Sequence, residues 1–210
     1  MNLPFMIPEF PQFKKLELSD RKDLEKFTSK FPPYSDFNFV SMWAWDTKGE
    51  MQISQLNGNL VVQFTDYING KPFFSFLGDS LVLDTIKTLL DFSKKNFDKI
   101  KLKLVPEKCV ERVSLDEFDV VSDENAYDYV YEVSHLANMH NWTQNTSGKQ
   151  VRSFVRSFPN YVVKHNSVKE VKKQDYLDIF NKWAQNKNIK ESVILNEYIA
   201  LNRIFKEGLE

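Results

Sequence analysis

Nothing in this 210-residue sequence restricts the fold more than the dipeptide Asn57-Gly58. It stands between two apolar runs, 51–56 and 60–64. Asn and Gly readily take the positive φ that a tight two-residue hairpin turn requires, so this arrangement predicts a β-hairpin. The apolar run 73–77, which ends at Gly78, predicts a third strand beside it.

Helical patterns stand on both sides of these strands. Ser19 is a suitable N-cap for the first helix, and the pair Pro32-Pro33 stops it. Apolar spacing predicts helices at about 20–31, 37–45, 80–97, 107–113, 148–158, 175–187 and 192–207, and further strands at 100–104, 118–121, 127–133 and 161–164. This mixture favours a three-layer α/β or an α+β domain.

The tail after Lys169 contains two amphipathic helices and no clear strand. Their apolar faces need a sheet or a partner to cover them. Gly208 is a signal that ends a helix, so another element is expected to begin beyond it.

Composition excludes several classes of protein. The hydrophobic fraction of 42% argues against disorder, and the single cysteine, Cys109, excludes a disulfide framework and a cysteine-rich zinc site. The net charge of −1 gives no global reason to expect nucleic-acid binding. We find no apolar stretch of the roughly 20 residues that a membrane span needs and no signal peptide, so we expect a cytoplasmic protein.

Charge is less balanced locally. Residues 116–132 contain seven acids and no Lys or Arg, whereas residues 138–174 contain seven bases and one acid. The two segments either neutralise each other as solvated faces, or the second provides a basic surface for a phosphate-bearing substrate.

The predicted helix at 148–158 favours the second interpretation. At 100° per residue, Lys149, Arg152 and Arg156 fall within roughly 60° of one another, opposite an apolar side that we expect to be core. That side consists of Val151, Phe154, Val155 and Phe158. We therefore take the three basic residues as candidate contacts to a ligand or phosphate.

Other chemistry is weakly indicated. His135 and His140 are five residues apart, which suits no helical metal pair, so we predict no metal site. Cys109 is either a reactive thiol or, more commonly, a small buried hydrophobe. The aromatic residues Tyr34, Phe37, Trp43 and Trp45 either line a ligand pocket or belong to the core.

Two stretches resemble one family. Phe31–Asp46 reads FPPYSDFNFVSMWAWD, and Asp128–Ala137 reads DYVYEVSHLA and leads on to Arg152–Tyr161. Both resemble motifs of proteins similar to the C-terminal domain of phosphatidylglycerol lysyltransferase. The resemblance implies two acetyltransferase-like (GNAT) halves in tandem. Residues 1–135 would form the first half, an α+β domain with a mixed sheet flanked by helices. Residues 136–210 would form a basic linker helix and the helical start of an incomplete second half.

The resemblance also implies a function. The chain would be the N-terminal portion of an aminoacyltransferase or acyltransferase, with aminoacyl-tRNA or acyl-CoA as donor, a lipid headgroup as acceptor and no permanently bound cofactor. The missing second half would follow Glu210 and hold most of the acyl-transfer site, so no catalytic residue is assigned. The alternative is a non-catalytic binding or scaffold half that docks a partner chain or, as a homodimer, a second copy. Direct RNA binding, with Trp142 and Tyr161 stacking bases beside the basic residues, is a third possibility.

Overall fold

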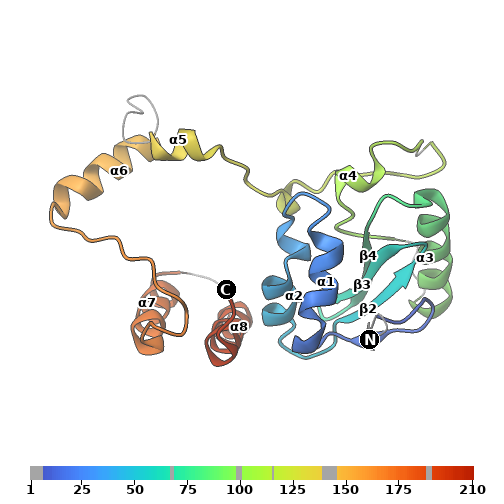
Figure 1. Cartoon of the computed structure of the whole chain (residues 1–210), viewed down its shortest axis with the longest axis horizontal. Helices are drawn as coiled ribbons and strands as arrows, with labels where there is room; N and C mark the ends of the chain where they lie inside the picture. Colours follow the sequence, from blue (N-terminus) through green and yellow to red (C-terminus); the bar gives the residue numbers. More distant parts are fainter. Residues whose placement is uncertain (1–6, 67–68, 98–100, 115, 139–145, 188–190) are drawn as a thin grey trace, which may run out of the picture. The chain divides into compact units, whose positions relative to one another are not determined.

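The computed structural model describes residues 7–66, 69–97, 101–114, 116–138, 146–187 and 191–210. The chain divides into two compact units. The first unit combines residues 1–126 with 168–210, and the second unit covers Tyr127–Ser167. The protein is α+β, with a four-stranded antiparallel sheet and helices (Figure 1). The predicted boundary between residues 135 and 136 concerns the start of a second half and stays a prediction.

The sheet has the strand order β1-β2-β3-β4. Its strands are β1 (Lys14–Lys15), β2 (Gln52–Leu56), β3 (Asn59–Thr65) and β4 (Pro72–Leu77), and every pair is antiparallel. The predicted hairpin is confirmed. Leu56 pairs with Asn59 across the turn, where Asn57 and Gly58 have φ values of 54° and 79°. Local sequence therefore sets the register of β2 and β3.

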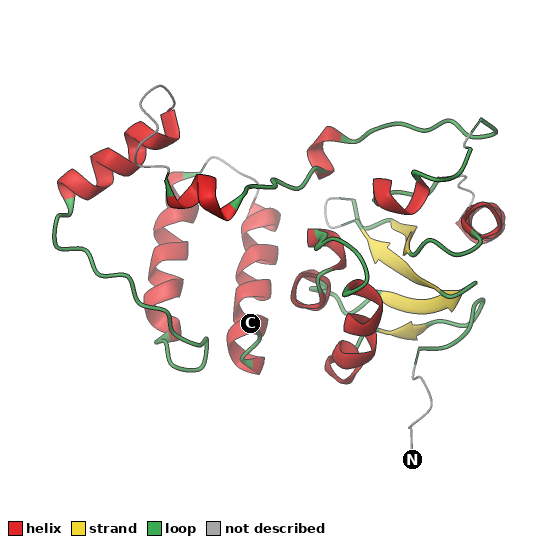
Figure 2. Ribbon diagram, turned by 45° about the horizontal axis from the view of Figure 1, so that its top comes forward, coloured by secondary structure: helices red, strands yellow, loops and turns green. Residues whose placement is uncertain are grey.

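Helices cover both faces of this sheet (Figure 2). Helices α1 (Arg21–Thr28) and α2 (Phe39–Trp45) lie on one side and α3 (Val82–Phe97) on the other. Phe37 packs edge-on against Phe64 of β3, and Phe92 of α3 packs edge-on against Phe74 of β4. Burial on both faces explains why Leu60, Val61 and Val62 are consecutive apolar residues and are all fully buried.

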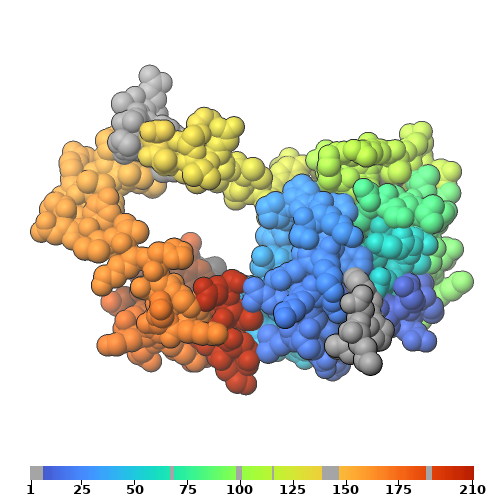
Figure 3. Space-filling view, viewed as in Figure 1, coloured from blue at the N-terminus to red at the C-terminus, as the bar shows by residue number. Residues whose placement is uncertain are grey.

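The remaining helices of the first unit are α4 (Glu107–Val110), α7 (Lys173–Asn186) and α8 (Glu191–Glu207). Aromatic side chains of α7 and α8 pack against each other, and the ring centres of Tyr176 and Phe205 are 5.4 Å apart. Figure 3 shows α8, in red, lying directly against the N-terminal part of the chain. Gly208 ends α8 at φ 62°, and the N–H of Leu209 donates to the carbonyl of Ile204. This is the predicted helix-ending role of Gly208.

The second unit contains helices α5 (Val133–Ala137) and α6 (Thr146–Ser157). The strands predicted at 127–133 and 161–164 are wrong, because the structure has no strand in either segment. The strand predicted at 118–121 is also wrong. A strand needs a neighbour to pair with its N–H and C=O groups, and no described strand adjoins these segments.

Two further predictions need correction. Of the strand predicted at 100–104, the described residues 101–104 form one parallel bridge, Leu102 to Phe74. The first helix begins later than predicted, since a 3-10 turn at Leu18–Asp20 precedes α1, and Ser19 lies inside that turn. Among the described residues, no helix is both long and apolar enough to cross a membrane.

Candidate functional site

Helix α6 carries the three predicted contact residues. The helix forms as predicted. Its backbone hydrogen bonding continues one residue past Ser157, because the N–H of Phe158 donates to the carbonyl of Phe154. Lys149 and Arg156 are exposed, and Arg152 is half-buried. Their i, i+3 and i+7 spacing places them on one face, which we call the basic face.

The basic face concentrates positive charge. Its three cations share a helix of twelve residues that contains no acid. Arginine presents a rigid fork of N–H donors that suits phosphate or carboxylate oxygens. The structure therefore places the three predicted contact residues on one helix, as the sequence predicted, and their role in binding stays a prediction.

The opposite side of α6 is not core, contrary to the prediction. Phe154 is 50% exposed and Phe158 is 58% exposed. The ring of Phe154 lies 5.1 Å from that of Phe158 and 5.4 Å from that of Tyr161. These three rings, with Pro159 and Asn160, line a shallow hollow on the second unit. Residue type alone predicted burial here, but no described element of the second unit covers these rings.

The second unit exposes further large hydrophobic residues. Tyr129 and Val130 are about nine-tenths exposed, at 88% and 90%. Exposed hydrophobic residues that gather in one patch are typical of interaction sites in folded proteins. Among the residues of this unit that the structure describes, the exposed large hydrophobic ones are Tyr127, Tyr129, Val130, Tyr131, Val133, Leu136, Phe154, Val155, Phe158, Tyr161, Val162 and Val163.

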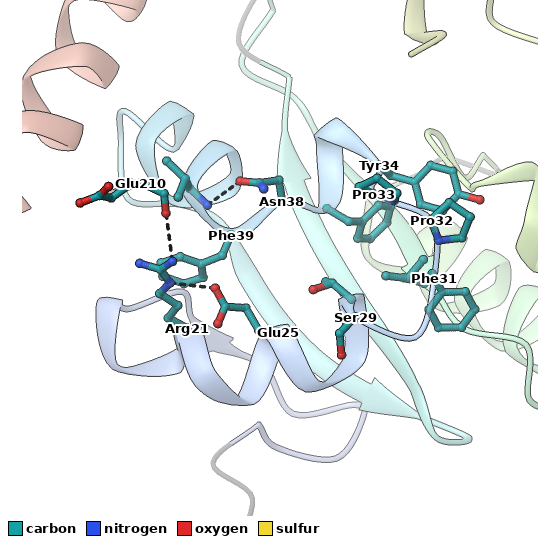
Figure 4. A pocket seen from close by; sticks show the side chains of 14 residues that line it. Arg21, Glu25, Ser29, Phe31, Pro32, Pro33, Tyr34, Asn38, Phe39 and Glu210 are labelled. Carbon is teal, nitrogen blue, oxygen red and sulfur yellow. Dashed lines mark hydrogen bonds and ion pairs between the residues drawn. The ribbon is translucent and has the colours of Figure 1, made fainter. Parts of the chain in front are cut away.

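A separate pocket of about 230 Å³ lies in the first unit (Figure 4). It lies between α1, the loop Phe31–Tyr34 and the start of α2. At one end the side chain of Arg21 donates to the carbonyl of Glu210 at 3.0 Å and pairs with Glu25 at 2.8 Å. The pocket therefore combines apolar side chains of this loop and of α2 with charged groups at this end.

The predicted pocket aromatics do not come together at one site. Tyr34 and Phe37 line the pocket, and Phe37 is also part of the core. Partial burial, more than any neighbouring charge, raises the pKa of the Tyr34 phenol. Trp43 and Trp45 do not line this pocket. The face of Trp43 is covered by Arg203 of α8, and Trp45 is 41% exposed.

Arg203 is a residue that sequence reasoning missed. Its guanidinium donates to the backbone carbonyl of Asp46, and burial, the largest cause, lowers its pKa. It lies 157 residues from Asp46 in the sequence, so no local pattern identifies the contact.

The other candidates for chemistry are structural. Cys109 is buried, accepts a hydrogen bond from the N–H of Gly78, and has its pKa raised by burial. This confirms its interpretation as a small buried hydrophobe. His135 is exposed near Glu132, and His140 lies outside the described residues. Among the His, Cys, Asp and Glu residues that the structure describes, no three are grouped so that they could hold a metal ion.

Comparison with known proteins gives one informative match. A scan against protein-family models found no matching family, and a search of curated proteins found no matching protein. The structure is similar to the crystal structure of a conserved protein of unknown function from Bacteroides thetaiotaomicron VPI-5482, with a TM-score of 0.68 and 22% identity. The match covers 95% of this chain and 67% of the solved chain. At this identity the likeness concerns the fold alone.

Proposed function

We propose that this chain is the N-terminal portion of an acyltransferase or aminoacyltransferase similar to the C-terminal domain of phosphatidylglycerol lysyltransferase. The resemblance of Phe31–Asp46 and Asp128–Ala137 to that family supports the proposal. In it, the first unit's sheet and flanking helices correspond to an acetyltransferase-like half. About a third of the solved chain lies outside its match with this chain.

The observation that carries the proposal is the basic face of α6. Its three cations, with no acid on the helix, suit the phosphates of an aminoacyl-tRNA or an acyl-CoA donor. The chemistry would consist of holding the donor's activated ester beside the amine or hydroxyl of an acceptor, here a lipid headgroup. In this proposal the basic face positions the donor, and the reacting groups come from the second half. A tRNA donor is a cytoplasmic molecule, so the proposal includes that compartment.

Removal of the three cations tests this role. The variant Lys149→Ala/Arg152→Ala/Arg156→Ala should bind charged tRNA or acetyl-coenzyme A about tenfold more weakly, since three exposed ion pairs contribute about 0.5 kcal/mol each. For tRNA, the slope of log affinity against log salt concentration should fall by about 2 to 3, because three phosphate contacts are lost. Fluorescence anisotropy at two salt concentrations measures both quantities.

A matched control separates local contacts from total charge. Lys94, Lys95 and Lys101 are exposed and lie in the first unit. Their replacement by alanine removes the same three charges and should leave the affinity within twofold of the unmodified protein. Equal losses in the two triple variants, or no loss in either, would remove the basic face from the proposal.

A second function is favoured by the exposed hydrophobic residues of the second unit: a non-catalytic binding or scaffold half that docks another protein surface. A folded protein of this kind should bind an apolar dye such as ANS while it still melts cooperatively. The double variant Phe154→Ser/Phe158→Ser should reduce the dye signal without lowering the melting temperature, since both rings are largely exposed. No dye binding by the unmodified protein would contradict this function.

A further inference from the structure

Two segments of the second unit lie outside its helices and have the composition of strands. Tyr127–Glu132, which ends where α5 begins, alternates aromatic or β-branched residues with Asp128 and Glu132, and Tyr161–Lys164 joins a tyrosine and two valines to a lysine. Both segments are exposed, and no described strand pairs with either. An exposed strand of this kind is a template for pairing with another chain.

The two segments are complementary in one antiparallel register. If Lys164 lies opposite Asp128, then Val162 lies opposite Val130 on the same face of the sheet. On the other face, Tyr161 then lies opposite Tyr131 and Val163 opposite Tyr129. Opposite charges and aromatic or β-branched partners are the cross-strand pairs that stabilise a sheet.

We propose that two copies of this chain associate through their second units, with Tyr127–Glu132 of each copy pairing antiparallel with Tyr161–Lys164 of the other. The described residues of this unit include both segments without a strand pairing between them, and a second copy offers the complementary strand to each. Each copy has one acidic and one basic segment. In a dimer with two-fold symmetry, the acidic segment of each copy therefore pairs with the basic segment of the other, and the same contact forms twice. This inference gives a partner to the docking function proposed above and is independent of acyl transfer.

The exposed area agrees with a dimer. The exposed aromatic side chains that the structure describes in the second unit, four in the two segments, one on α6 and one just after it, present roughly 700 Å². A specific interface buries about 800 Å² on each partner.

Engineered cysteines test the register. In a Cys109→Ala background, a copy with Val130→Cys and a copy with Val162→Cys, carrying different tags, should form a disulfide-linked heterodimer on mild oxidation. Directly opposed residues bring their Cβ atoms close enough for this bond. The matched control pairs Val130→Cys with Val163→Cys, which the register places on the other face, and should cross-link at least tenfold less. Equal yields, or a disulfide only within one chain of the double variant Val130→Cys/Val162→Cys, overturn the proposal.

The unmodified protein provides a second test. Sedimentation equilibrium should give twice 24.8 kDa at micromolar concentration. Asp128→Lys should raise the dissociation constant about tenfold, and the double variant Asp128→Lys/Lys164→Asp should restore it. A strictly monomeric protein overturns the dimer. If that monomer still binds ANS, the docking function stands with a different partner, and if it does not, both fail.

Discussion

The guanidinium carbon of Arg203 lies 4.0 Å from the centre of the Trp43 ring. This contact joins α8 to α2 across 160 residues of sequence. The same guanidinium donates to the carbonyl of Asp46, just after α2, while Thr47 donates to Asn196 of α8 at 3.2 Å. The C-terminal helix is thus held to the N-terminal layer by a cation on an aromatic face and by polar contacts on either side.

We expect Arg203→Ala to lower the free energy of unfolding by about 2 to 3 kcal/mol. The variant loses a partly desolvated cation–π contact and a hydrogen bond from a charged donor. Urea denaturation followed by tryptophan fluorescence measures the change. Arg112 is the control, since its side chain is 82% exposed, and Arg112→Ala should change stability by less than about 0.5 kcal/mol. Equal effects would mean that α8 is not held by Arg203.

Gly78 marks a close approach between the end of β4 and Asn59. A Cβ atom at Gly78 would lie 2.0 Å from Oδ1 of Asn59, which is fully buried. The amide of Asn59 donates to the carbonyl of Ser80 and to Thr85, so it cannot move without losing these bonds. Gly78→Ala should therefore cost roughly 2 to 4 kcal/mol of stability.

Gly49 provides the comparison for this glycine. It has φ 65°, and nothing lies within 4 Å of a Cβ built there. Gly49→Ala should cost only the backbone penalty, about 1 to 2 kcal/mol. Thermal or urea unfolding of the two variants measures both losses of stability. We expect Gly78→Ala to be the more destabilising, and the reverse order would contradict the packing around Asn59.

The buried thiol predicts how stability changes in mild alkali. Burial raises the pKa of Cys109 in the folded state, whereas in the unfolded chain it titrates near 8.5. The unfolded state then binds fewer protons, so stability is complete below about pH 8.5 and falls above it, by at most about 1.4 kcal/mol per pH unit. Urea unfolding between pH 7.5 and 9.5 should show this decline, and Cys109→Ala should flatten it. An unchanged slope in the variant would mean that the thiol is not buried when folded.

The sequence predicted elements that depend on nearby residues. Asn57-Gly58 gave the hairpin through its turn geometry, and apolar periodicity identified α6, α7, α8 and the shared face of Lys149, Arg152 and Arg156. The contact of Arg203 with Trp43 could not be predicted, because a cation–π pair between residues 160 positions apart leaves no local sequence pattern.

The wrong strand predictions have a different cause. Tyr127–Val133 has the alternation of a strand, but a strand forms only where a neighbour satisfies its backbone. The residue types of a segment indicate how well it suits a sheet. They do not indicate whether a neighbouring strand is present to pair with it. Similarly, the apolar side of α6 suits a core, and whether Phe154 and Phe158 are buried depends on what covers the helix.

The central proposal is that this chain is the N-terminal portion of a longer transferase. The intact mass of the protein purified from its own cells tests this most directly, against 24.8 kDa for the 210 residues. The account predicts a clearly heavier species, whose additional sequence follows Glu210 and whose transferase activity is lost when Lys149, Arg152 and Arg156 are replaced together. A mass of 24.8 kDa would contradict the proposal and leave the docking function in its place.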